Sequence, residues 1–272
     1  MKKIVTLVFA LVATSCWAQK TISDSFSPSS YGACIICGGS VSGINKDERF
    51  AMHSVMKFPQ ALYVADYLSR KGLALDDTIV VDKADLMQDT WSPMLKQFEG
   101  KMAFSYAQLL ELSLAQSDNN ACELLFKHCG KPKAVEKYIR KLGFYDIHVR
   151  MTEEQMHKNP TMAIENSSTP AEMARLFEWL YYYKDDNQYL TFIWKTMEDC
   201  STGLKRIPAA IPADARIVHK TGTGFPSEGL QDMNDAGIIL MPDGSHVIIA
   251  VFTTNSPSEA VIADIAKQLL EE

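Results

Sequence analysis

The stretch AGIILMPDGSHVIIAVFTT, residues 236–254, decides the fold of this chain. Two runs rich in isoleucine and valine flank a polar turn centred on Asp243 and Gly244, and this arrangement predicts two antiparallel strands in a hairpin. Another run of strand-forming residues precedes the pair. The strands are expected at 217–221, 236–241 and 247–254. The end of the chain is therefore predicted to form an antiparallel meander.

The middle of the chain has the period of helices instead. Apolar residues after Ser54 recur at helical spacing and stop at Gly72, as in a helix with a glycine just past its end. Ser105 and Gln108 form a capping box that starts a second helix. Further helices are expected over 121–128, 132–142, 170–183 and 257–270. We predict an α/β fold in which an antiparallel sheet is flanked by helices and joined to an all-helical lobe, with a cleft between them.

The composition narrows the range of partners. With 33 acidic and 27 basic residues among 272, the formal net charge is −6, which gives no electrostatic reason to expect nucleic acid or an anionic membrane. A small-molecule or cell-wall substrate fits this charge better. No linker or repeat divides the chain. We expect one catalytic domain over 19–272 that acts as a monomer.

The start of the chain resembles a bacterial export signal. Two lysines precede a mostly apolar run at 4–13 that is too short to span a bilayer. Small residues favour cleavage before Gln19, which makes 1–18 a signal peptide. The alternative is a lipoprotein anchor at Cys16. We expect a periplasmic protein with no membrane attachment unless Cys16 is lipidated.

The cysteines and histidines predict no metal or redox centre. Removal of the signal leaves five cysteines, so at least one is not paired within the chain. They are Cys34, Cys37, Cys122, Cys129 and Cys200. Cys34 and Cys37 form a C-x-x-C on an expected strand at 33–37, where positions three apart point to opposite faces, and we interpret them as buried, inert thiols. The six histidines lack ligand spacing, so we expect no metal and no cofactor.

Ser54 and Lys57 form an S-x-x-K at the start of a predicted helix. Residues three apart share a helical face, so Lys57 can reach the Ser54 hydroxyl and take or relay its proton. The unpaired amides of a first helical turn can also hold an oxyanion. Alone, the motif is better explained by a surface serine and lysine on a helix.

Two further tripeptides change that balance. SDN at 117–119 falls at a break between two helices, and KTG at 220–222 lies on a predicted strand. Alone, the first is explained by a helix cap and the second by an ordinary edge strand. The lysine and threonine of KTG can hold a carboxylate, and its glycine can let a substrate approach the backbone.

S-x-x-K, SDN and KTG in this order are the motifs of class A β-lactamases and penicillin-binding proteins, and the chain resembles the class A family over 49–272. The segments at 220–224, 234–237 and 242–244 are also similar to that family's terminal strands. The resemblance implies hydrolysis of β-lactam antibiotics, cephalosporins included, through an acyl-enzyme on Ser54. It leaves open a D-alanyl-D-alanine peptidase or penicillin-binding protein, and a non-catalytic penicillin sensor or degenerate homologue.

The resemblance also implies roles for the motif residues. Ser117 would protonate the departing lactam nitrogen, and Asn119 would bind the acylamino side chain. The substrate carboxylate would be held by Lys220, Thr221 and Thr223, and the oxyanion by the backbone amides of Ser54 and Thr223.

Two residues outside the motifs match the family pattern with an open alternative each. Arg206 matches an arginine that some members supply for the substrate carboxylate, or it is an exposed arginine without that role. Trp91 resembles an aromatic residue at the mouth of the cleft, or it is a core tryptophan.

The segment EEQMH at 153–157 is similar to the Ω-loop of a class A branch in which histidine replaces asparagine. Glu153 would activate the water that deacylates the enzyme, and His157 would help to hold that water. Glu154 is the rival base, and two solvated loop carboxylates are the alternative. Whether Lys57 or Glu153 is the base for acylation stays open.

The chain departs from the family pattern at two places. Met151 and Asn166 stand where an arginine and an aspartate commonly clamp the Ω-loop, so we expect a looser loop that admits bulkier cephalosporins. Residues 21–43 lack a helical period where family members have an N-terminal helix, so part of a core layer is expected to be missing.

Overall fold

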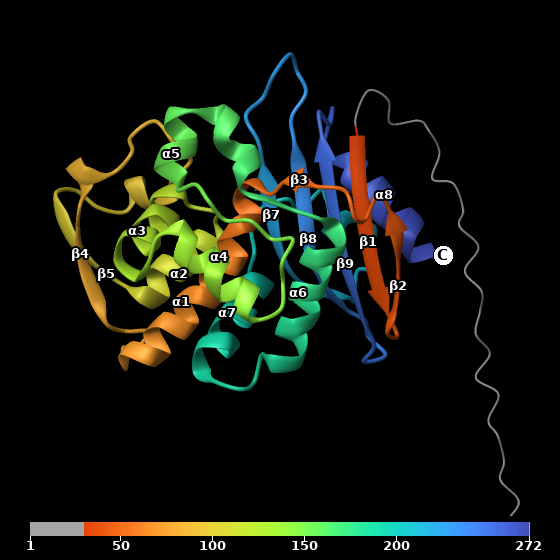
Figure 1. Ribbon diagram of the computed structural model, residues 1–272, viewed down its shortest axis with the longest axis horizontal. Coiled ribbons are helices and arrows are strands. Elements are labelled where there is room, and N and C mark those ends of the chain that lie inside the picture. The colour runs from red at the N-terminus through yellow and green to blue at the C-terminus, as the bar shows by residue number, and fades with distance from the viewer. Residues whose placement is uncertain (1–29, 272) are drawn as a thin grey trace, which may run out of the picture.

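The sheet forms one side of the molecule, and a computed structural model describes it within residues 30–271 (Figure 1). Its strand order is β2-β1-β9-β8-β7, and every neighbouring pair is antiparallel. The strands are β1 (Ser30–Cys37), β2 (Ser40–Ile44), β7 (Arg216–Thr223), β8 (Met233–Leu240) and β9 (His246–Thr254). The predicted meander is therefore confirmed as β7-β8-β9.

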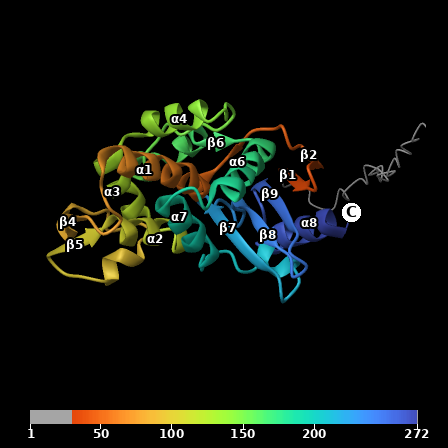
Figure 2. The same ribbon diagram turned by 90° about the horizontal axis from the view of Figure 1, so that it is seen from below.

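Helices cover both faces of this sheet, which explains why its central strands are almost wholly apolar. On one face α8 (Ala260–Glu271) packs Ile262 and Ile265 against Ile249 and neighbouring strand residues. On the other face α6 (Pro170–Tyr183) crosses β1, β8 and β9 (Figure 2). The main core continues from this second face into the helical lobe.

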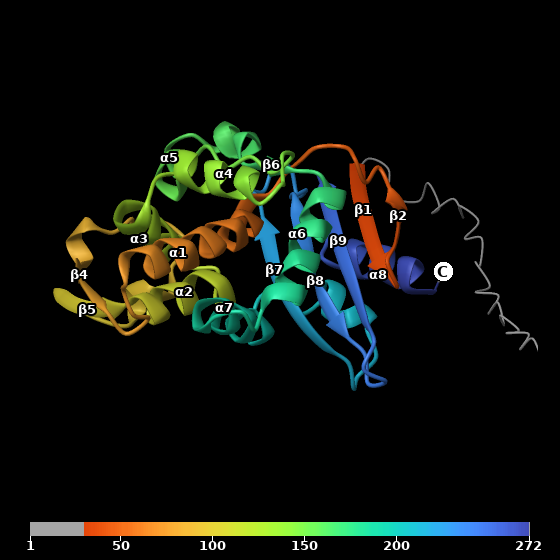
Figure 3. The same ribbon diagram turned by 60° about the horizontal axis from the view of Figure 1, so that its bottom comes forward.

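The helical lobe is built around α1, whose sides are surrounded by other helices (Figure 3). The helices here are α1 (Lys57–Lys71), α2 (Tyr106–Ala115), α3 (Asn119–Cys129), α4 (Pro132–Lys141) and α7 (Gln188–Glu198). Phe58 of α1 packs on Phe177 of α6, with ring centroids 4.2 Å apart, so the lobe and the sheet layer share one core. The predicted α/β fold with an all-helical lobe is confirmed.

Short elements complete the chain between the two layers. They are β3 (Phe50–Ala51) paired with β6 (Ser167–Ser168), β4 (Thr78–Asp82) paired with β5 (Lys101–Ser105), α5 (Glu153–Lys158), and the 3-10 turns η2 (His53–Met56), η3 (Lys83–Asp85), η4 (Pro93–Lys96), η5 (Pro160–Glu165) and η6 (Ile207–Ala210). The predicted capping box is present, because Ser105 Oγ accepts from the Gln108 amide at 3.1 Å and Gln108 Oε1 accepts from the Ser105 amide at 2.9 Å.

Several elements were not predicted from sequence, among them the β4–β5 hairpin and α7. The hairpin of β4 and β5 has mostly exposed or half-buried residues, so it lacks the alternation that marks a strand. Helix α7 begins at Asn187, whose side chain accepts from the amides of Tyr189 and Leu190. Its start is an asparagine cap within a polar, acidic segment, which is also typical of a loop.

Several expectations concern the N-terminal region. The signal peptide, its cleavage before Gln19 and the alternative anchor at Cys16 lie outside the described residues. The described part of 21–43 forms β1 and β2 and no helix, as expected. Among residues 30–271, no helix is long and apolar enough to cross a membrane.

The cysteine prediction needs one correction. Cys34 is buried, but Cys37 is exposed, because Cys37 is the last residue of β1 and lies beyond the part of the strand whose two faces are packed. All five cysteines within residues 30–271 are free thiols.

Candidate active site

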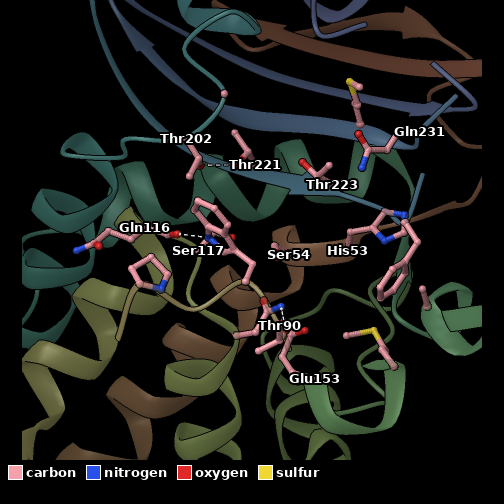
Figure 4. Close-up of a pocket in the computed structure, with 18 of the residues that line it drawn as sticks. His53, Ser54, Thr90, Gln116, Ser117, Glu153, Thr202, Thr221, Thr223 and Gln231 are labelled. Atoms are coloured by element: carbon pink, nitrogen blue, oxygen red, sulfur yellow. Dashed lines mark hydrogen bonds between the residues drawn. The ribbon is translucent and has the colours of Figure 1, made fainter. Parts of the chain in front are cut away.

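Lys57 is the centre of the site and is fully buried. Its Nζ donates to Ser54 Oγ at 3.0 Å, to the Ser117 carbonyl at 2.8 Å and to Asn119 Oδ1 at 2.7 Å. S-x-x-K and SDN therefore meet around one ammonium group, whose three hydrogens all have acceptors. Figure 4 shows Ser54 between Glu153 on one side and Thr221 and Thr223 on the other.

Ser54 lies in the 3-10 turn η2, one turn before α1. The preceding residue, His53, has a left-handed φ of 47°, which is unusual for a side chain of this size. Its Nε2 lies 3.1 Å from Asp232 Oδ2, so an ion pair to the β7–β8 connection supports this conformation. A Cβ at Gly224 would lie 2.7 Å from the His53 ring, so a glycine is required there.

Gly222 of KTG makes a packing contact that the sequence did not predict. A Cβ at this position would lie 2.3 Å from the Met52 carbonyl oxygen and 3.2 Å from Val55. The glycine therefore lets β7 pack directly against η2, the turn that carries Ser54. The approach of a substrate to this glycine stays a prediction.

The SDN segment combines a structural residue with two that line the cleft. Asp118 is the N-cap of α3 and accepts from the Ala121 amide at 2.8 Å, from Ser92 Oγ at 2.9 Å and from the Met94 amide at 2.7 Å. Burial raises the pKa of Asp118, although the backbone hydrogen bonds oppose this shift. The helix-cap explanation is thus correct for Asp118, whereas Ser117 and Asn119 line the cleft.

Lys220 lies beneath Ser117 and is fully buried. Its Nζ donates to Ser117 Oγ at 2.9 Å and to the Thr221 carbonyl at 3.0 Å. Burial lowers the pKa of Lys220 to about 7. The third motif is thus joined to the second, and the Ser117 hydroxyl lies between the lysine and the cleft.

Arg206 is 4% exposed, so the alternative of an exposed arginine is wrong. It donates to Thr223 Oγ1 at 2.7 Å and to the carbonyls of Gly222 and Asn234, both at 2.8 Å. Its Nε also pairs with Glu259 at 2.9 Å. These contacts hold the guanidinium at the end of β7, beside the cleft.

Glu153 and Glu154 point in different directions from α5. Glu153 is 7% exposed and lines the cleft, where its Oε1 lies 3.2 Å from Lys57 Nζ. Although that distance makes an ion pair, Oε1 accepts no hydrogen bond within the described part of the chain, since the lysine hydrogens point to three other acceptors. Glu154 pairs instead with Lys158 at the surface, at 2.7 Å.

His157 lies in the wall of the cleft, one helical turn after Glu153. Its Nε2 is 2.9 Å from Asp89 Oδ1, so the imidazole contacts the opposite side of the cleft. Trp91 is 63% exposed in the same cleft and donates from Nε1 to the Gln116 carbonyl at 2.9 Å. The alternative of a core tryptophan is therefore wrong.

Asn166 closes the Ω-loop through hydrogen bonds to the main chain, in place of the arginine and aspartate that commonly clamp it. It is fully buried, and its Oδ1 accepts from the amides of Arg150 at 2.8 Å and Met151 at 2.9 Å. Its Nδ2 donates to the Met151 carbonyl at 2.9 Å, and its own carbonyl accepts from the Met52 amide at 2.8 Å. One residue thus closes the loop and joins it to the nucleophile turn.

Asn166→Ala is expected to destabilise the protein by about 1–3 kcal/mol, because two backbone amides lose their acceptor. Thermal unfolding and limited proteolysis within 150–166 measure this loss. Asn159→Ala in the same loop is the control, since Asn159 is exposed and caps only Thr161. Equal melting temperatures for the two variants would contradict the assigned role of Asn166.

Several cleft residues had no sequence signal. Thr202 contacts Thr221 through their hydroxyl oxygens at 2.5 Å, and Phe225 is exposed at the rim. The unpredicted lining residues include His53, Asp89, Thr202, Phe225, Gln231 and Glu259. The cleft has a volume of about 830 Å³. No group of three or more histidine, cysteine or acidic residues within 30–271 is placed to hold a metal ion.

A cleft serine hydrogen-bonded to a buried lysine at a helix start, next to an edge strand, defines a serine hydrolase. Comparison with known proteins gives the family. Residues 20–272 match the model described as the beta-lactamase enzyme family, and the chain belongs to that family as a class A serine β-lactamase.

Individual relatives cover most of the chain. It is 35% identical to beta-lactamase VEB-1 of Pseudomonas aeruginosa over 82% of this chain and 78% of that protein. It is 36% identical to the extended-spectrum beta-lactamase PER-1 of Pseudomonas aeruginosa, over 82% and 75%. The solved structure of TLA-3 extended-spectrum beta-lactamase superposes with a TM-score of 0.85 at 30% identity, over 89% of this chain and 92% of that one. A beta-lactamase from Chitinophaga pinensis gives 0.84 at 32% identity, over 89% and 93%.

Proposed function

We propose that this serine β-lactamase divides its reaction between two groups of residues, one on each side of Ser54. Ser54, Lys57 and Glu153 form and hydrolyse the acyl-enzyme, while Ser117 and the residues of β7 bind the substrate and protonate its nitrogen. The observation that carries the proposal is the position of Lys57 Nζ, 3.0 Å from Ser54 Oγ and 3.2 Å from Glu153 Oε1.

In acylation, Ser54 Oγ bonds to the lactam carbonyl carbon and loses its proton. That proton leaves to Lys57 Nζ, 3.0 Å from Ser54 Oγ, or to Glu153, whose Oε1 lies 3.2 Å from the same Nζ. The backbone amides of Ser54 and Thr223 hold the oxyanion. The carbon–nitrogen bond then breaks as the lactam nitrogen takes the Ser117 proton, which Lys220 Nζ at 2.9 Å can replace.

The substrate carboxylate is held by Thr221 and Thr223, with the positive charges of Arg206 and Lys220 behind them. Arg206 contacts Thr223 Oγ1, and Lys220 contacts the Thr221 carbonyl. A carboxylate placed there receives hydroxyl hydrogen bonds reinforced by two cations in a mostly buried setting. Asn119 lines the opposite wall, where its amide can bind the acylamino group.

Deacylation requires a base for a water molecule next to the ester. Glu153 Oε1 is buried in the cleft wall and accepts no hydrogen bond within residues 30–271, so it is free to accept one from water. His157 lines the same wall and helps to hold that water. The ester carbon gains the hydroxide, Glu153 gains the proton, and Ser54 recovers its own proton as the bond breaks.

We extend the proposal to cephalosporins with bulky side chains. A cleft of about 830 Å³ is at the large end of ordinary ligand sites, and its rim holds the exposed rings of Trp91 and Phe225. The relative PER-1 is named an extended-spectrum enzyme, which supports the same range here.

Mixing the purified protein with a chromogenic cephalosporin, followed by intact-protein mass measurement, tests this function. Continued colour change with no lasting adduct supports the lactamase. A stable adduct would indicate a peptidase or a penicillin sensor instead, and no adduct a degenerate homologue. An oxyimino cephalosporin in the same assay tests the bulky-substrate extension separately.

Export to the periplasm as a monomer is part of the proposal. The apolar run at 4–13 after two lysines supports it. Fractionation of expressing cells separates a released protein that begins at Gln19 from a lipoprotein held at Cys16.

A further inference from the structure

A line of polar groups leads from the interior of the protein to the cleft through Cys200. Asp235 Oδ1 of β8 lies 2.8 Å from His219 Nδ1 of β7, and the His219 imidazole neighbours the Cys200 thiol, whose pKa it lowers. Cys200 Sγ lies 3.4 Å from Thr202 Oγ1, which in turn lies 2.5 Å from Thr221 Oγ1. The first three groups are buried, whereas Thr202 and Thr221 line the cleft (Figure 4).

We propose that Cys200 is a positioning residue for substrate binding, whose thiol fixes the direction in which the hydroxyl groups of Thr202 and Thr221 donate their hydrogens. The inference rests on the proposed role of Thr221 in holding the substrate carboxylate. It adds a buried residue that does not line the cleft and belongs to none of the sequence motifs.

Counting the available hydrogens gives the direction of the hydrogen bonds along this line of groups. Thr221 can donate to a substrate carboxylate only if its hydrogen does not point to Thr202, so Thr202 must donate to Thr221. Thr202 Oγ1 is then left as an acceptor, and the Cys200 thiol can donate to it at 3.4 Å, closer than the competing Thr202 carbonyl at 3.9 Å. A thiolate at Cys200 reverses the direction of these hydrogen bonds. It accepts the hydrogen of Thr202, and Thr202 then accepts the hydrogen of Thr221.

His219 makes the thiol available for this purpose. Its Nδ1 contacts the Asp235 carboxylate, so a neutral imidazole would accept the Cys200 hydrogen at its other nitrogen. Burial disfavours the charge on His219, but Asp235 and Cys200 outweigh this effect and raise the pKa of His219 to about 10. The imidazolium donates to sulfur, which leaves the thiol hydrogen free for Thr202.

The charge on Cys200 sets the pH range in which the hydrogen bonds run in the direction that lets Thr221 donate to the substrate carboxylate. Burial would raise the pKa of Cys200, but the hydrogen bond and charge of His219 and the charge of Lys220 lower it to about 7. The thiol is therefore present below about pH 7 and is lost as the pH rises. The titratable groups that face this chain are His219 and Lys220 on β7, Asp235 on β8, Lys57 on α1 and Arg206 before η6.

Three substitutions at Cys200, assayed at about pH 6, separate the possible roles. Cys200→Ser keeps a neutral donor and should leave KM for a cephalosporin near the wild-type value. Cys200→Ala removes the donor and should raise KM about 2- to 10-fold with little change in kcat. Cys200→Asp introduces a carboxylate, which only accepts hydrogen bonds at any pH above its own pKa. It should therefore raise KM at least as much as Cys200→Ala does.

Other outcomes would overturn the proposal. If Cys200→Asp keeps the wild-type KM and Cys200→Ser does not, Cys200 is a counter-charge for Lys220 instead. Equal KM values for all three variants would exclude any positioning role. Cys129→Ser, a buried thiol at the end of α3, is the control for loss of a buried cysteine, and thermal unfolding of each variant reports its folding.

Thr221→Val keeps the two hypotheses distinct. If KM is unchanged in this variant, Thr221 does not hold the carboxylate and that part of the proposed function fails. If KM rises in Thr221→Val while the Cys200 series stays flat, the carboxylate site is retained and only the role of Cys200 is rejected.

Discussion

Replacing Ser54 by alanine is expected to lower kcat/KM for β-lactams by roughly 10⁴- to 10⁶-fold, the range seen when a covalent nucleophile is removed. The nearby Ser117 hydroxyl cannot take its place, because it accepts from Lys220 rather than from Lys57. The fold should persist, since Lys57 keeps the Ser117 carbonyl, Asn119 and Glu153 as partners.

The measurements for Ser54→Ala are steady-state hydrolysis and the mass of the protein after incubation with substrate. Neither turnover nor an added mass is expected. Ser69→Ala is the matched control, because Ser69 is exposed near the far end of α1, the helix that follows Ser54. Substantial residual turnover by Ser54→Ala, with wild-type melting temperature, would place the nucleophile elsewhere.

Glu153→Gln is expected to trap the acyl-enzyme and to lower kcat by about 10²- to 10⁴-fold, the usual contribution of a general base. Glutamine keeps the size of the side chain but cannot take a proton from water. A burst of one product equivalent, followed by a stable mass increase, is the expected signature. Glu154→Gln is the neighbouring control, because Glu154 pairs with Lys158 at the surface.

The rate of the burst also identifies the base for acylation. A fast burst in Glu153→Gln means that Lys57 can activate Ser54 without the glutamate. A burst slowed as much as deacylation means that Glu153 serves both steps. Normal turnover by Glu153→Gln together with an adduct on Glu154→Gln would exchange the roles of the two glutamates.

The sequence predicts best those features that depend on local spacing. Ser54 and Lys57 are three residues apart on one turn, and the capping box at Ser105 is equally local, so both follow from pattern alone. The meander was predictable because β8 and β9 are joined by a short turn.

Long-range contacts explain what sequence could not predict. Gly222 packs against a carbonyl 170 positions earlier (222 − 52), and Asn166 closes its loop through main-chain groups that any residue carries. Thr202 belongs to no motif and acquires its place only when the segment after α7 packs beside β7. The exposure of Cys37 likewise depends on where β1 ends relative to the helices that pack on it.

The contact between Gly222 and the Met52 carbonyl bears on how this enzyme can change under antibiotic selection. Any side chain at position 222 would push β7 away from η2, the turn that carries Ser54. New substrates therefore cannot be accommodated by widening the contact between these two elements. Adaptation must instead occur at the outer rim, where Trp91 and Phe225 are exposed and a changed side chain disturbs little else.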